Sequence, residues 1–235
     1  MDENLRYIDS HFIARTDLLA RTGIDDGQLQ ALVDQRLIPR ASYFPDENGW
    51  IRSNLGGVPI AIDDAYFHPS LISHIHEVRS LLAAGADCEQ LAEERRTAFC
   101  ASYACRVRSM HALGLLEQEI REKHFADPDA LAAVANTEYE HWLAGTYGLC
   151  TRENTPEAVA IKECTVRNID HLAQGEELRG DARERLVRYI RLYDSVAAFF
   201  APFERKGSSR YRLCTVIPER YGLDMDSGTA TRNDA

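Results

Sequence analysis

The sequence lacks the segments that would carry the chain into or across a membrane. It has no apolar run close to 18 residues, the length that a membrane-spanning helix needs. Its first ten residues are acidic and polar, which does not fit a secretory signal. The six cysteines include no C-x-x-C pair, and we expect them to be reduced thiols. We therefore expect a cytoplasmic protein that does not act at a membrane.

Motifs for metals and cofactors are also absent from the sequence. Neither H-x-x-x-H nor H-E-x-x-H occurs, and His74 and His76 stand two residues apart, about 200° around a helix, so they could not chelate one ion together. Gly56 and Gly57 are adjacent but are not followed by the residues of a nucleotide-binding loop. We expect neither a metal nor a cofactor.

The composition is that of an acidic globular protein. The chain has 235 residues, of which 45% are hydrophobic, and this is enough for one large core or two modest ones. The formal net charge of −10 favours solubility and disfavours non-specific binding to nucleic acid or anionic lipid.

Apolar residues recur mostly at helical spacing, so we predict a mostly α fold. Residues 1–65 are expected to form a helix-turn-helix-like module with a short β-hairpin, because Gly23 separates two short helical patterns and Asn48-Gly49 is a hairpin turn signal. Residues 66–221 are expected to form a larger helical-bundle domain, and residues 222–235 a disordered tail.

Residues 7–39 resemble the helix-turn-helix of MerR-like proteins and end in Leu37-Ile38-Pro39. The helix that would read DNA carries Asp25 and Asp26, however, and residues 1–80 hold seven arginines, no lysine and twelve acidic residues, a net charge of −5. Contacts from lysine and arginine to phosphates supply most non-specific affinity for DNA. We therefore favour a structural or partner-docking module and do not expect nucleic acid binding.

The stretch from residue 138 to 172 combines apolar pattern, helix signals and reactive side chains. Thr155, Pro156 and Glu157 form a strong helix start, and the helix is expected to run from about residue 156 to 173. Its polar face carries Lys162 and Glu163, with Glu163 placed for an ion pair to Arg167. This face is either simply solvated or contributes Glu157 and Lys162 to a substrate site.

Upstream of that helix, residues 145–148 turn the chain sharply between two helices. The turn is expected to gather His141, Tyr147, Cys150 and Arg152 around one corner. Histidine titrates near neutral pH and arginine binds oxyanions, so we single out His141 and Tyr147 as candidate catalytic residues and Arg152 as a candidate substrate ligand. A purely structural role explains the same residues equally well: their polar groups could simply hydrogen-bond to each other where the two helices meet.

A second polar cluster occupies residues 203–212. Arg205, Ser208, Ser209 and Arg210 could form a cradle for phosphate, sulfate or carboxylate. The alternative is that these cations neutralise the acidic surface of neighbouring helices.

Four segments together resemble a domain-of-unknown-function family of bacterial natural product biosynthesis proteins. They are YFHP at 66–69, HWLAGTYGLC at 141–150, TPEAVAIKE at 155–163 and FAPFERKGSSRYRL at 200–213, and the resemblance extends from Tyr7 to about Tyr221. It implies a role in specialised metabolism. We therefore hypothesise a cofactor-free enzyme, or one subunit of an enzyme, that acts on a small anionic or amino-acid-derived substrate.

In this hypothesis His141 is the general base or orienting group, Tyr147 its hydrogen-bond partner, and Arg152, Arg205 and Arg210 hold an anionic group. A partner subunit from the same pathway fits it as well. Two other functions stay open: a ligand-sensing regulator that retains the MerR-like module, and a non-catalytic docking subunit. The single-site hypothesis also requires that Tyr147 and Arg152 lie close to Ser208 and Arg210.

Overall fold

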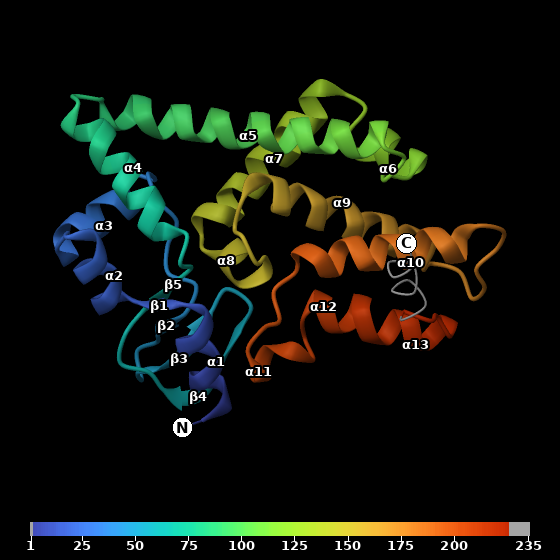
Figure 1. Cartoon of the computed structure of the whole chain (residues 1–235), viewed down its shortest axis with the longest axis horizontal. Coiled ribbons are helices and arrows are strands. Elements are labelled where there is room, and N and C mark those ends of the chain that lie inside the picture. The colour runs from blue at the N-terminus through green and yellow to red at the C-terminus, as the bar shows by residue number, and fades with distance from the viewer. Residues whose placement is uncertain (1, 226–235) are drawn as a thin grey trace, which may run out of the picture.

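The N-terminal part of the chain combines short helices with short strands. The computed structural model describes residues 2–225 (Figure 1). Its first elements are α1 (Glu3–His11), β1 (Ile13–Ala14), α2 (Arg15–Thr22), α3 (Asp26–Asp34), β2 (Phe44–Pro45), β3 (Trp50–Ser53), β4 (Gly56–Ala61), β5 (Tyr66–Phe67) and α4 (Leu71–Ala83).

The rest of the described chain is helical. It contains α5 (Cys88–Ala112), α6 (Gln118–His124), α7 (Pro128–Leu143), α8 (Thr146–Cys150), α9 (Pro156–Leu172), α10 (Ala182–Val196), α11 (Pro202–Arg205), α12 (Ser209–Tyr211), a π-helical turn (Arg212–Val216) and α13 (Ile217–Tyr221). The predicted mostly α fold, with a small hairpin near its N-terminus, is confirmed.

The turn between α2 and α3 follows from local sequence. Gly23 ends α2 in the left-handed conformation, with a φ of 64°, and Asp25 begins α3 through a capping box with Gln28. The apolar faces of α2 and α3 pack with α4 around a core of their own, which includes Leu18, Leu32 and Ile75.

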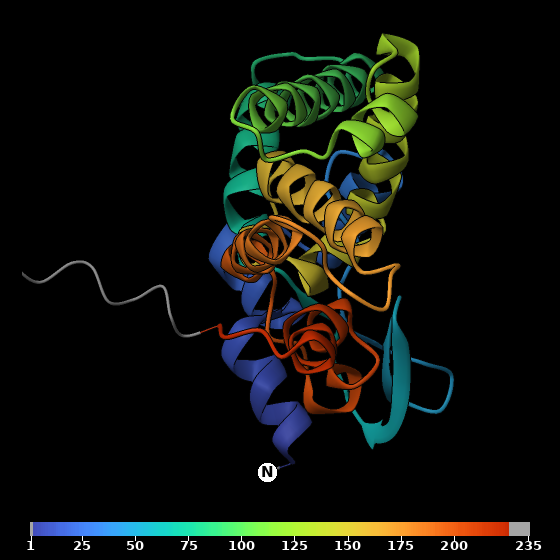
Figure 2. The ribbon, with the colours of Figure 1, turned by 90° about the vertical axis from the view of Figure 1, so that its right-hand side faces the viewer.

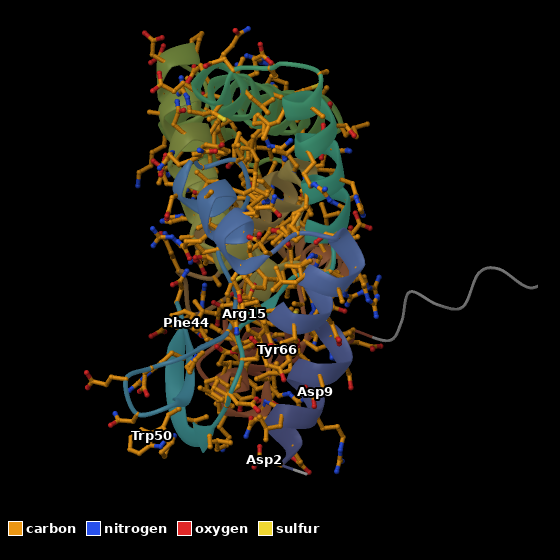
Figure 3. The ribbon with its side chains drawn as sticks, turned by 90° about the vertical axis from the view of Figure 1, so that its left-hand side faces the viewer. Asp2, Asp9, Arg15, Phe44, Trp50 and Tyr66 are labelled. Atoms are coloured by element: carbon orange, nitrogen blue, oxygen red, sulfur yellow. The ribbon has the colours of Figure 1, made fainter. Side chains whose placement is uncertain are left out.

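The predicted hairpin is present and is extended by a third strand. Strands β2, β3 and β4 form an antiparallel sheet, with Pro45 opposite Ile51, and β1 pairs with β5 in a second small ladder. Figure 3 shows Phe44 and Trp50 on this sheet, where both side chains are exposed. Ile51 alternates with them and is fully buried in the main core.

Helix α9 is central to the helical part and packs against both α5 and α10 (Figure 2). It begins as predicted, because Thr155 Oγ1 accepts a hydrogen bond from the Ala158 amide and Pro156 occupies the first turn. The apolar pattern that follows Asp181 predicts a helix that ends near Pro202, but α10 ends at Val196. The following residues are extended and form a β-bridge between Ala197 and Thr151.

The main core joins the N-terminal part of the chain to the helices. Tyr7, Tyr43 and Ile51 pack in the same cluster as Trp142 of α7 and Val159 of α9. The division of the chain at residue 65 stays a prediction. The predicted disordered tail lies mostly outside the described residues. Within residues 2–225 no helix is both long and apolar enough to span a bilayer.

Candidate functional site

A cavity of about 460 Å³ lies where three distant parts of the chain meet. We call it the central cavity. Its walls come from the end of α7, from α8 and α9, from the turn between β3 and β4, and from residues 200–209. They consist of Leu55, Gly56, Gly57, Glu138, His141, Thr146, Tyr147, Cys150, Lys162, Glu163, Phe200, Phe203, Glu204, Gly207, Ser208 and Ser209. The fold therefore brings His141, Tyr147 and Lys162 together with Ser208 and Ser209.

Gly145 allows α8 to fold back beside the end of α7. Its φ is 82°, and a Cβ there would lie 2.7 Å from Ala41 O and 2.8 Å from Arg40 O. Only glycine fits both this conformation and this close approach. The turn places Tyr147 of α8 next to Glu138 and His141 of α7.

Five side chains on the cavity wall form a continuous polar network. The Tyr147 hydroxyl lies 2.5 Å from Glu138 Oε2 and 3.1 Å from Glu163 Oε1. Glu138 Oε2 is also 3.0 Å from His141 Nδ1, and Glu163 Oε1 is 3.1 Å from Lys162 Nζ. The order of the network is thus His141, Glu138, Tyr147, Glu163 and Lys162.

Burial and the contacts between neighbouring charges together determine the charge states within this network. It raises the pKa of Tyr147 far above its usual value of 10, and the two neighbouring carboxylates raise it further, so the phenol is a hydrogen-bond donor and not a base. Burial opposes the charge of Lys162, but the Glu163 carboxylate more than offsets it and the pKa of Lys162 rises above 10.5. Burial likewise opposes the charge of Glu163, whose pKa is nevertheless lowered by Lys162.

These charge states restrict the chemistry that the wall can perform. A lysine with a raised pKa stays an ammonium at neutral pH and does not act as a neutral amine nucleophile. Burial raises the pKa of Cys150 to about 11, so it is a thiol and not a thiolate nucleophile. His141 remains: its side chain is 54% exposed, and Glu138 holds one of its two ring nitrogens. Proton transfer by His141 stays a prediction, and Glu204, whose pKa burial raises, lines the same cavity.

Two expectations about α9 were wrong. Lys162 is only 8% exposed, so its face of the helix is not simply solvated. The predicted ion pair between Glu163 and Arg167 does not form. Glu163 pairs with Lys162 instead, and the Arg167 guanidinium lies 4.0 Å from Glu138 Oε1. On this face of α9 the charged side chains contact Tyr147 of α8 and Glu138 of α7, and not solvent alone.

The opposite wall is organised around Glu204 of α11. Its carboxylate accepts hydrogen bonds from the Tyr43 hydroxyl at 2.7 Å and from the Ser53 hydroxyl at 2.5 Å. Burial raises the pKa of Glu204, and these hydrogen bonds only partly oppose that effect. Asn54 donates to Ala144 O at 2.6 Å, so the turn between β3 and β4 is tied to both sides of the cavity.

Several residues predicted for the site lie elsewhere. The Arg152 guanidinium donates to Ala197 O and to Asp194 O, at the C-terminal end of α10, and Glu157 lines no part of the central cavity. Arg205 and Arg210 line a second cavity of about 470 Å³, which we call the arginine cavity. Ser209 and Arg210 separate because consecutive residues in a helix point about 100° apart.

The single-site hypothesis therefore fails in part. Tyr147 and Ser208 share the central cavity, but Arg152 and Arg210 lie outside it. Sequence reasoning did not assign Glu138, Glu163 or Glu204 to the site. The spacing of Glu138 and His141, three residues apart in a helix, was the available signal, because such residues lie on one face. Within the described residues, no three histidine, cysteine or acidic side chains are arranged to hold a metal ion.

Comparison with known proteins gives a family but no function. No curated protein and no solved structure matches the chain. One family model, described as a family of unknown function and designated DUF6058, matches residues 96–222. This range contains the whole polar network and Glu204, but not the MerR-like segment or the turn between β3 and β4. Because the match covers more than half of the sequence, the chain belongs to the DUF6058 family of unknown function.

Proposed function

We propose that this protein is an enzyme, or a subunit of one, in specialised small-molecule metabolism, and that it transfers a proton on an amine-bearing, amino-acid-derived substrate in the central cavity. The observation that carries the proposal is the position of the Tyr147 hydroxyl between the carboxylates of Glu138 and Glu163.

Such an arrangement is expensive for a protein to maintain. Removing charged groups from water costs several kcal/mol each, and apolar residues of similar volume often serve stability as well or better. Here the charged groups, although largely buried, line a cavity. Clusters of this kind in a concave pocket are typical of functional sites.

The charges of the wall favour an amine as the group that is bound. Glu138, Glu163 and Glu204 contribute carboxyl groups. Lys162, the one lysine or arginine that residues 2–225 place on the wall, is already paired with Glu163. The Arg167 guanidinium, which does not line the cavity, lies 4.0 Å from Glu138 Oε1. An ammonium group of the substrate would offset this excess of acidic groups, and the Ser208 and Ser209 side chains offer further polar contacts. The amino-acid-derived substrate class therefore fits the central cavity better than a purely anionic one.

Within this proposal His141 exchanges the proton. Glu138 accepts from the Nδ1 side of the ring and orients it, which leaves Nε2 for the substrate. Tyr147 donates its single hydroxyl proton to Glu138, the nearer carboxylate, and Lys162 keeps Glu163 charged. General acid-base catalysis contributes roughly 10²- to 10⁴-fold to a rate. His141→Gln should reduce turnover by a factor in that range and leave the fold intact.

The test starts from native mass spectrometry of the protein purified gently from its own host. We expect a retained small molecule that carries an amine, and the same spectrum would show a partner subunit. That molecule, or its precursor, is then assayed with the wild type, His141→Gln and the matched control His111→Gln, an exposed histidine on α5. A retained molecule without an amine would contradict the substrate class. Equal turnover by His141→Gln and the wild type would contradict the mechanism.

A further inference from the structure

The arginine cavity has the opposite electrostatic character to the central cavity. It lies between α1, residue 199 and the segment from α11 to the π-helical turn, and is lined by Tyr7, His11, Phe199, Arg205, Ser208, Arg210, Tyr211, Cys214 and Thr215. Two arginines line a volume of about 470 Å³, and within residues 2–225 no aspartate or glutamate lines it. In a chain with a net charge of −10, this composition points to an anionic occupant.

Arg205 is placed to bind that occupant. Its Nε donates to Phe200 O at 3.1 Å, which fixes the guanidinium, and within residues 2–225 it has no carboxylate at ion-pair distance. Its terminal N–H groups can therefore serve a ligand. A fixed, planar guanidinium suits the paired oxygens of a carboxylate or phosphate.

Arg210 supports the same surface in a different way. It forms an ion pair with Asp194, and its guanidinium carbon lies 4.5 Å from the centre of the Phe199 ring. In the described part of the chain its buried Nε has no hydrogen-bond partner. The ion pair with Asp194 and the contact with Phe199 thus hold the Arg210 guanidinium beside an aromatic ring that is 49% exposed.

Aromatic groups make up much of the remaining wall. The His11 ring stacks on Tyr7 with centroids 4.3 Å apart, and its Nδ1 donates to Tyr7 O at 2.9 Å, so the ring is held in place as part of the wall. Tyr211 is 39% exposed. The Phe199 ring is covered by the guanidinium groups of Arg152 and Arg210, at 4.8 and 4.5 Å from its centre, so His11 and Tyr211 are the rings that a planar or apolar group attached to the anion would contact.

We propose that the arginine cavity binds an organic oxyanion, a carboxylate or phosphate ester with an aromatic body, as a ligand distinct from the substrate of the central cavity. The segment Gly207–Ser209 lies between the two cavities, and α11 contacts both α1 on one side and β4 on the other. In Figure 2 the last helices lie between α1 and the hairpin. The proposal does not depend on the function of the central cavity.

Isothermal titration calorimetry on the full chain tests this site with three probes: phenyl phosphate, benzoate and benzylamine. We expect one or both anions to bind, with affinity that falls as salt rises, and benzylamine not to compete with them. Arg205→Gln should weaken anion binding about ten- to hundredfold, since a hydrogen bond to a charged group contributes about 1.5–3 kcal/mol. Arg108→Gln, which removes an exposed arginine on α5, should leave the affinity unchanged.

A second variant removes the space and leaves the charge. Thr215→Phe would fill part of the arginine cavity, and we expect it to weaken anion binding while Arg205 is intact. Circular dichroism melting confirms that each variant is folded. The ratio of phenyl phosphate to benzoate affinity identifies the preferred oxyanion. Failure of both anions to bind the wild type, or unchanged affinity in folded Arg205→Gln and Thr215→Phe, would overturn the proposal.

Discussion

The Lys162 ammonium lies 3.1 Å from the Glu163 carboxylate, although consecutive residues of a helix point about 100° apart. The long lysine side chain bends toward its neighbour on α9. Both side chains are largely buried on the wall of the central cavity, and only 10% and 16% of their surfaces are exposed. The pair is thus a structural unit of the site and not a surface contact.

Breaking this pair should cost more stability than removing it. Glu163→Gln leaves the Lys162 charge buried without its partner, and the expected loss is about 3–5 kcal/mol of unfolding free energy. The double variant Lys162→Met/Glu163→Leu should lose much less, because no unpaired charge remains. Urea denaturation measures both, with Glu119→Gln, an exposed carboxylate on α6, as the control. A Glu163→Gln variant as stable as the wild type would show that the Lys162 charge is not sealed from water.

The pH dependence of stability should show a contribution from His74. Burial, together with the nearby Arg95, lowers the pKa of His74 from 6.5 to about 4. The folded protein therefore resists protonation, and this contribution to stability is full above pH 6.5 and is lost as the pH falls from 6.5 to about 4.

Replacement of His74 tests this assignment directly. The wild type should lose on the order of 3 kcal/mol across that window relative to His74→Gln, which does not titrate. His76, two residues further along α4, is exposed and provides the matched control His76→Gln. Identical pH profiles of melting temperature for the wild type and His74→Gln would contradict the assignment.

Glu204 should act in the opposite direction. Because burial raises its pKa above 4.5, the folded state holds the proton more tightly than the unfolded chain. Its contribution is full below pH 4.5 and is lost as the pH rises through the raised pKa. Glu204→Gln should therefore gain stability relative to the wild type when the pH is raised from 5 to 8. Differential scanning calorimetry at pH 5 and pH 8 measures the stability difference between Glu204→Gln and the wild type, and Glu219→Gln, at an exposed position, is the control. The same difference at both pH values would contradict the raised pKa of Glu204.

The turn at Gly145 should tolerate no side chain. Gly145→Ala combines a left-handed backbone with a Cβ that would lie 2.7 Å from Ala41 O. Gly114 has a similar φ of 66° but no atom within 4 Å of its Cβ position, so Gly114→Ala should cost only the backbone term, about 1 kcal/mol. Thermal melts should show a clearly larger loss for Gly145→Ala. Equal losses would mean that the backbone at Ala41 moves aside at no cost.

The N-terminal helices should not bind DNA. Asp25 caps α3 and Asp26 pairs with Arg15, so the acidic start of this helix is part of its structure. Fluorescence anisotropy with the protein's own upstream DNA at low salt is expected to show no binding. Affinity that falls steeply with added salt would instead support the ligand-sensing regulator.

Local sequence signals predicted most of the fold. Thr155 and Pro156 define the start of α9, and Gly23 the end of α2, through bonds within a few residues. The end of α10 was misplaced because a long-range β-bridge from Ala197 to Thr151 stops it, and no nearby glycine or proline marks that position.

The site was harder to predict, for a physical reason. Charged residues on a helix face are usually solvated. Lys162 is internal because it contacts Glu163 and the Tyr147 ring, and the sequence does not reveal the contact with Tyr147. Ser208 lines both cavities, whereas Arg210, two positions further along the chain, lines only the arginine cavity. Which side chains share a cavity depends on tertiary contacts between residues more than 100 positions apart, such as that of Ser53 with Glu204.

Leu55, in the turn between β3 and β4, and Gly56 and Gly57, at the start of β4, line one side of the central cavity, whereas the side chains of the polar network belong to α7, α8 and α9. Under the proposed function, selectivity and reactivity would be carried by separate stretches of the polypeptide. Exchanging or lengthening the turn between β3 and β4 would reshape this side of the cavity while the His141 and Glu138 pair stayed in place. If the proposed function holds, the hairpin is the place at which directed evolution would broaden or switch the substrate range.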